Sequence, residues 1–203
     1  MSIHRVSANI DDYRRVSPGT YQVCPGLCPP VLRAGRANVG KWEGMGLRFL
    51  NIGIPQGTTI NAANLIITSS ENTNDACGTR ISAENVDNPT PFDLDNYAAA
   101  AARWANRTVA RVDWDFAPAV VWVLNTEYNS PDIAAVIQEI INRPGWVSGN
   151  AIAIFWNDWD ARTAIDRHRP AYPYNVDNAR AVRLNIDWEA TPTVQTLPAT
   201  EVT

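Results

Sequence analysis

The segment that begins at Ser130 carries the only strong helix signal in the chain, and it lies among stretches with strand character. Ser130 is a suitable N-cap, Pro131 fits the first helical position, and Asp132 suits the positive end of a helix dipole. Five apolar side chains then follow at helical spacing and form one face: Ile133, Val136, Ile137, Ile140 and Ile141. The Arg-Pro-Gly sequence at 143–145 ends this pattern. The sequence therefore predicts one short amphipathic helix over about residues 131–142, which must lie against a sheet to bury its isoleucines.

Six further segments have the composition of strands and are separated by turn-rich loops. They are residues 47–54, 61–68, 79–84, 108–114, 150–156 and 181–188. The apolar run at 150–156 is typical of a central strand that is covered on both faces. The segment 181–188 alternates with a period of two, which directs four side chains toward the core: Val182, Leu184, Ile186 and Trp188. Many short strands with a single helix predict an all-β antiparallel sandwich.

An α/β fold is the alternative, and it needs helices that alternate with strands along the chain. The alanine-rich residues 98–102 favour a helical turn, but no apolar face accompanies them, and we interpret them as a loop. Pro-Gly and Pro-Pro pairs interrupt the first 40 residues, which predicts an extended arm or an edge strand with long loops. We therefore expect an N-terminal arm and loop region at 1–40, a sandwich at 41–189 and an extended C-terminal tail at 190–203.

Composition and charge exclude several classes of partner. The chain has 203 residues, 45% of them apolar, and a net charge of −4 from 17 basic and 21 acidic residues. This length can bury a core without metals or disulfides. No apolar run reaches the roughly 18 residues of a membrane span, and a chain without a basic block is a poor nucleic-acid binder. Residues 1–6 lack a secretory signal, so we expect a mature form or release by a route such as lysis.

Three cysteines, Cys24, Cys28 and Cys77, allow two interpretations. In the first interpretation, all three are buried thiols or thiols without a specific role. In the second, Cys24 and Cys28 form a local disulfide across a Pro-Gly turn, and Cys77 pairs with another subunit. A tetrahedral zinc site is not indicated, because His4 and His168 show no spacing relation to the cysteines.

Catalytic motifs are missing from the sequence. It contains no Gly-x-Ser-x-Gly, no His-Glu-x-x-His and no phosphate-binding glycine loop. His168 lies in a polar, surface-like stretch, which does not favour a catalytic triad. Two carboxylate pairs, Glu84 with Asp87 and Asp113 with Asp115, have the residue types of a glycosidase site but are explained more simply as loop caps. We therefore predict a protein that is not an enzyme.

Two kinds of binding site remain as candidates. Calcium prefers oxygen ligands of the kind found in three acidic loops, although no fixed ligand spacing appears and Asx turns are the simpler explanation of these residues. The calcium candidates are Asp87, Asp93, Asp95, Asp158 and Asp160. Flat aromatic rings can stack on sugars, and three of the eight tryptophans lie near predicted loops or strand ends. These glycan-stacking candidates are Trp42, Trp156 and Trp159, and we assign the other five to the core.

The helix segment also resembles a known family of domains. Its run at residues 129–133, 136–146 and 148–153 is similar to jelly-roll β-sandwich domains of secreted bacterial proteins and bacteriophage particle proteins, described as carbohydrate-binding-like or galactose-binding-like. Further similar segments follow in the same order at 47–60, 62–65, 83–88, 107–114 and 180–188. The resemblance covers roughly residues 34–188 and implies a jelly-roll fold. It does not imply a ligand, because function belongs to sites rather than to folds.

The resemblance leads to two functional expectations. The first is a structural protein of a bacteriophage particle, such as a capsid decoration, collar or tail-associated subunit, with other virion subunits and further copies of itself as partners. The second is a carbohydrate-binding module for attachment to a host or matrix. Both place the protein in a virion or outside the cell, with no cofactor apart from the calcium candidate.

Overall fold

The computed structural model describes residues 1–17, 20–23, 31–38, 40–92, 97–118, 120–158, 160–164 and 166–189. Within these ranges it contains twelve strands and two helices. The first six strands are β1 (Ser2–Arg5), β2 (Asp12–Ser17), β3 (Thr20–Val23), β4 (Leu32–Asn38), β5 (Lys41–Phe49) and β6 (Ile60–Thr68). The other six are β7 (Cys77–Ala83), β8 (Val112–Phe116), β9 (Glu127–Asn129), β10 (Ile152–Asn157), β11 (Arg167–Ala171) and β12 (Arg183–Trp188). The helices are α1 (Tyr97–Ala105) and α2 (Ala134–Ile141).

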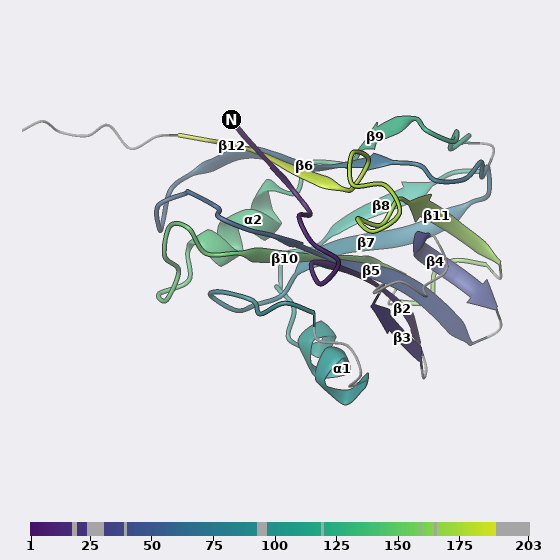
Figure 1. Ribbon diagram of the computed structural model, residues 1–203, viewed down its shortest axis with the longest axis horizontal. Coiled ribbons are helices and arrows are strands. Elements are labelled where there is room, and N and C mark those ends of the chain that lie inside the picture. The colour runs from purple at the N-terminus through teal and green to yellow at the C-terminus, as the bar shows by residue number, and fades with distance from the viewer. Residues whose placement is uncertain are drawn as a thin grey trace, which may run out of the picture.

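Two antiparallel sheets form the body of the molecule (Figure 1). The smaller sheet has the strand order β1-β12-β6-β9. The larger sheet is curled and has the order β11-β4-β5-β10-β7-β8, with β2 paired to β5 and β3 paired to β2. The two layers and their antiparallel pairing confirm the predicted all-β sandwich.

Eight of the strands are connected as a jelly roll. In chain order these are β1, β5, β6, β7, β8, β9, β10 and β12. The first pairs with the eighth, the second with the seventh, the third with the sixth and the fourth with the fifth, each pair antiparallel. This nested pairing is the topology of a double-sheet jelly roll, and the remaining strands and both helices are additions within its connections.

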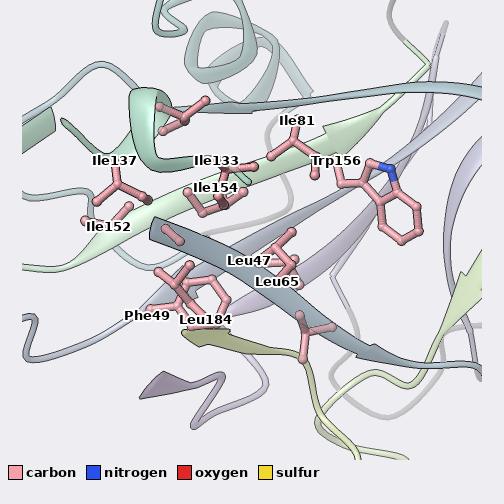
Figure 2. Close-up of a cluster of buried hydrophobic side chains, with 14 of the residues drawn as sticks. Leu47, Phe49, Leu65, Ile81, Ile133, Ile137, Ile152, Ile154, Trp156 and Leu184 are labelled. Carbon is pink, nitrogen blue, oxygen red and sulfur yellow. The ribbon is translucent and has the colours of Figure 1, made fainter. Parts of the chain in front are cut away.

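The sandwich core lies between the two sheets. Every residue of β10 is buried, as predicted for a central strand covered on both faces. On β12, Leu184 and Ile186 point into the core as the alternation predicts, whereas Trp188 is only half-buried. Figure 2 shows these layers meeting in one buried cluster, in which Ile133 and Ile137 accompany strand residues such as Leu65 and Ile154.

Helix α2 buries the predicted apolar face at one end of this core, but it begins later than predicted. Ile133 occupies the N-cap position, so the prediction that Ser130 caps the helix is wrong. The Ser130 hydroxyl instead accepts the Leu65 backbone N–H at 2.9 Å. The Asp132 carboxylate accepts the N–H groups of Ala134 and Ala63, both at 2.9 Å. The segment 130–132 is therefore used to attach the chain to β6 before the helix starts.

Helix α1 replaces the loop predicted at residues 98–102, and that prediction is wrong. Trp104 of this helix is buried and stacks on Phe155 at 4.7 Å between ring centroids. Phe92, which precedes the helix, packs against Tyr13 of β2 at 4.4 Å. These rings form a second apolar cluster on the outer face of the larger sheet. The helix depends on partners that are distant in sequence, which a local search for an apolar face cannot detect.

The first 40 residues also differ from the predicted arm. In the part of this region that the structure describes, β1 joins the smaller sheet as an edge strand, which agrees with the edge-strand alternative. Strands β2 and β4 pair with β5, and Val6, Leu32 and Ala34 are fully buried in the sandwich core. Because β1, β2 and β4 are integral strands, the predicted boundary at residue 40 does not separate two units. The segment holding Cys24 and Cys28 and the tail at 190–203 lie outside the described residues.

Candidate interaction surface

The connection between β8 and β9 exposes a group of large apolar side chains. Val120, Val121, Val123 and Leu124 are between 41% and 57% exposed, whereas Trp122 in their midst is fully buried. We call these four exposed residues the apolar loop. Singly exposed apolar residues are ordinary, but a contiguous group marks an interaction site in a soluble protein.

Trp122 anchors the apolar loop to the sandwich. Its indole N–H donates to the Pro170 carbonyl at 3.1 Å, and its ring stacks on Tyr128 of β9 with centroids 3.9 Å apart. The Trp122 backbone forms a two-way bridge with Thr73, at 2.7 Å and 2.9 Å. The buried ring therefore fixes the position of the exposed side chains on either side of it.

Further hydrogen bonds hold the backbone of the same loop. The Val123 N–H donates to the Tyr128 hydroxyl at 2.7 Å, and the Leu124 N–H donates to the Asn72 side chain at 2.8 Å. Asn125 then turns the chain toward β9 with a φ of 64°, a conformation that asparagine tolerates better than most residues. A loop held in this way loses little conformational entropy when a partner covers it.

Arginine pairing dominates the charged surface. The chain contains sixteen arginines and one lysine, and most of the arginines contact carboxylates within the same chain. Such pairs neutralise positive charge that phosphate binding would require. Among the described residues, no helix is long and apolar enough to cross a membrane.

The first candidate carboxylate pair is occupied by arginines. Arg103 forms a bifurcated hydrogen bond with Glu84, in which its Nε lies 2.9 Å from both carboxylate oxygens. Arg143 Nε lies 2.6 Å from Asp87, which was also a calcium candidate. Both carboxylates therefore act as partners of guanidinium groups that connect loops of the sandwich.

The second pair, Asp113 and Asp115, belongs to an ion-pair network on β7 and β8. Arg80 lies 2.5 Å from Asp113 and also contacts Asp160, another calcium candidate. Arg162 contacts Asp115. The Arg80 guanidinium holds the pKa of Asp113 below its usual value, which suits an ion-pair partner and not a general acid.

The remaining calcium candidates have simpler explanations or lie outside the structure. Asp158 accepts the backbone N–H groups of Arg162 at 2.7 Å and Thr163 at 2.9 Å, which is the turn-capping alternative. Asp93 and Asp95 lie outside the described residues. No cluster of three or more histidine, cysteine or acidic side chains suited to a metal occurs in the part of the chain that the structure describes.

Two of the three glycan-stacking candidates, Trp42 and Trp156, lie within the described residues. Trp156 is fully buried, stacks on Trp114 and donates its indole N–H to Thr79 at 2.7 Å, so its proposed role in sugar stacking is wrong. Trp42 is half-buried, with the Arg36 guanidinium 5.5 Å from its ring centroid. Trp159 lies outside the described residues.

Cys77 is a free thiol in the core, which agrees with the first of the two interpretations for this residue. Its sulfur lies 3.7 Å from the Thr163 hydroxyl and 3.6 Å from the Ala34 carbonyl oxygen. Burial raises its pKa to about 12. A bond from Cys77 to another subunit would require the sandwich to open, so the structure gives no support to that use of the thiol.

The apolar loop was not among the sites predicted from the sequence. Its signal is the uninterrupted apolar run at residues 119–124, which by itself is equally consistent with a buried strand. Comparison of the chain with protein-family models and with curated proteins finds no match. The fold and this surface are therefore the features of the molecule that bear on its function.

Proposed function

We propose that this protein is a non-enzymatic structural subunit of a bacteriophage particle, of the capsid decoration, collar or tail-associated kind, that acts through contacts with other subunits. The observation that carries the proposal is the apolar loop, which is exposed and yet held rigidly by Trp122 and Tyr128. A surface of this kind is costly to expose to water unless a partner covers it.

The topology gives further support. Double-sheet jelly rolls occur in viral capsid proteins and in lectins, and the resemblance found in the sequence includes particle proteins of bacteriophages. Topology alone does not assign a function, so the choice between particle assembly and sugar binding depends on the surface. Five of the seven tryptophans that the structure describes are buried, which favours a protein contact over a sugar platform.

Purified particles of the phage that encodes this chain provide the test. We expect the chain to copurify with the particles, and the full recombinant chain to bind particles whose own copy of the gene has been deleted. Two charges in the apolar loop, in the Val121→Asp, Leu124→Asp double variant, should abolish this binding because an unpaired carboxylate resists burial. Val147→Asp, at a comparably exposed valine outside this loop, is the matched control and should bind normally.

Two outcomes would contradict the proposal. One is a particle preparation that lacks the chain altogether. The other is binding of the full chain to a glycan array that is lost in both Trp42→Ala and Trp159→Ala, because that result would favour the carbohydrate-binding alternative.

A further inference from the structure

We propose that this protein assembles with further copies of itself by pairing the β1 edge of one copy with the β9 edge of the next, head to tail. The two strands form the opposite edges of the smaller sheet, so that sheet would become continuous from copy to copy. This inference deepens the proposed function by naming the partner, a second copy of the chain, and the surface that receives it.

Within the part of the chain that the structure describes, both edge strands pair with a neighbouring strand on one side only. Among the described residues, β1 pairs with β12 alone, and β9 pairs with β6 alone. The outer N–H and C=O groups of an edge strand can pair with another chain.

Strand direction favours a head-to-tail arrangement. Each strand of the smaller sheet is antiparallel to its neighbour, so β1 and β9 run in opposite directions. A second copy in the same orientation therefore presents its β1 antiparallel to β9 of the first, without the sheet being turned over. Contacts of this type are heterologous and generate rings or filaments, which suits a particle protein.

The charges on the two edges are complementary. Arg5 donates to the carbonyl oxygens of Asn178 and Ala179, and no carboxylate pairs with it among the described residues. It lies directly opposite Arg183 on β12, so two guanidinium groups share the outer face there. Arg183 in turn contacts Glu127, which is exposed on the β9 edge. A neighbouring copy would bring a second carboxylate to this pair of guanidinium groups.

One register of the two strands both pairs the opposite charges and places their side chains on the same face of the sheet. Antiparallel pairing that sets Arg5 of one copy opposite Glu127 of the next also sets Ile3 opposite Asn129, because strand residues two apart share a face. The apolar loop precedes β9, so the same register brings it toward the residues that follow β1, where Ile10 is exposed. The charged edge and the apolar loop would then be covered by the same neighbour.

A charge exchange tests the pairing with the full chain. Sedimentation of the wild-type protein over a concentration series should show assembly. Arg5→Glu or Glu127→Arg alone should raise the dissociation constant of assembly at least about tenfold, because each places like charges opposite one another. The double variant, R5E with E127R, should restore assembly. Lys41→Glu has the same charge change as Arg5→Glu at an exposed site away from both edges and should have no effect.

Circular dichroism and melting temperature establish that each variant is folded. The inference is overturned if the folded wild-type chain is monomeric at every concentration, if either single variant assembles normally, or if the double variant remains dissociated. Normal assembly of both single variants, together with loss of particle binding in the Val121→Asp, Leu124→Asp variant, would reject the edge pairing and leave the proposed function in place.

Discussion

Two adjacent carboxylates, Asp11 and Asp12, are buried where the chain enters β2. Asp11 is paired with Arg48 at 2.6 Å. Asp12 accepts the Tyr174 backbone N–H at 2.6 Å, and its other oxygen has no hydrogen-bond partner among the described residues. Burial, with a smaller contribution from the charge of Asp11, raises the pKa of Asp12 to about 7. The folded protein therefore binds a proton at Asp12 that the unfolded chain releases near pH 4.

The Asp12→Asn variant tests whether the raised pKa of Asp12 makes stability depend on pH. Because the folded pKa is raised, the stabilising contribution is complete below about pH 4 and is lost as the pH rises through about 7. The wild-type protein should lose on the order of 1–4 kcal/mol from this group between those limits, whereas the variant should lack that slope and be more stable at pH 8. Urea denaturation across the pH range measures this slope, with Asp166→Asn, at an exposed aspartate, as the control. Equal slopes in both proteins would contradict the assignment.

At the scale of elements, the outer face of the larger sheet depends on two glycines of β5. The Tyr13 ring of β2 lies where a side chain at Gly46 would be, and the Trp104 ring of α1 lies 2.5 Å from the corresponding position at Gly44. Because these glycines have no side chain, the Tyr13 ring of β2 and the Trp104 ring of α1 can contact the backbone of β5 directly. The second apolar cluster therefore exists because β5 lacks side chains at the points of contact.

Gly46→Ala should destabilise the fold by about 1–3 kcal/mol, because the added methyl group must displace a fully buried ring. Chemical denaturation gives the free energy of unfolding, and Gly53→Ala serves as the matched control because a Cβ at that position meets no atom within 4 Å. A Gly46→Ala protein as stable as the Gly53→Ala protein would show that Tyr13 does not pack as described.

At the scale of the whole molecule, the two sheets close over a single sandwich core that extends from α2 to Cys77 on β7. The smaller sheet contributes β6 and β12, the larger sheet contributes β5, β7 and β10, and Trp122 ties the β8–β9 connection into the same cluster. Access to a side chain in this core requires the layers to separate, so a buried thiol reports the opening of the sandwich.

Alkylation of Cys77 should therefore be limited by unfolding. At pH 8 in native buffer the thiol is both buried and protonated, because burial raises its pKa to about 12, and we expect it to react orders of magnitude more slowly than in urea. Mass spectrometry of the peptide that contains Cys77 follows this thiol separately from Cys24 and Cys28. Equally rapid labelling in both buffers would contradict the described burial.

The local pattern of apolar residues was sufficient to predict most strands of the sandwich. The predicted strands at 61–68, 79–84, 150–156 and 181–188 correspond closely to β6, β7, β10 and β12. Period-two alternation and continuous apolar runs report burial directly, because each strand exposes its side chains to two defined faces. Helix α2 was predicted from the helical spacing of its apolar residues, although the residues expected to start it bind β6 instead.

The candidate site could not be predicted in the same way. Trp156 and Trp122 occur in similar apolar runs, and only the packing of the sheets shows that both rings are buried while the neighbours of Trp122 are exposed. Two of the carboxylates proposed for calcium, Asp87 and Asp160, are bound by arginines distant in sequence, Arg143 and Arg80. Pairing partners separated by more than 50 residues leave no periodic signal in the chain.

By itself, then, the amino-acid sequence determined the all-β class, most of the strands and the buried face of one helix, because these follow from the spacing of apolar residues along a short stretch. Only the tertiary structure decided that α1 forms, that the first strands belong to the sandwich, and that the apolar loop faces solvent beside the β9 edge of the smaller sheet. Those features depend on contacts between distant segments, and such contacts exist only once the two sheets have packed.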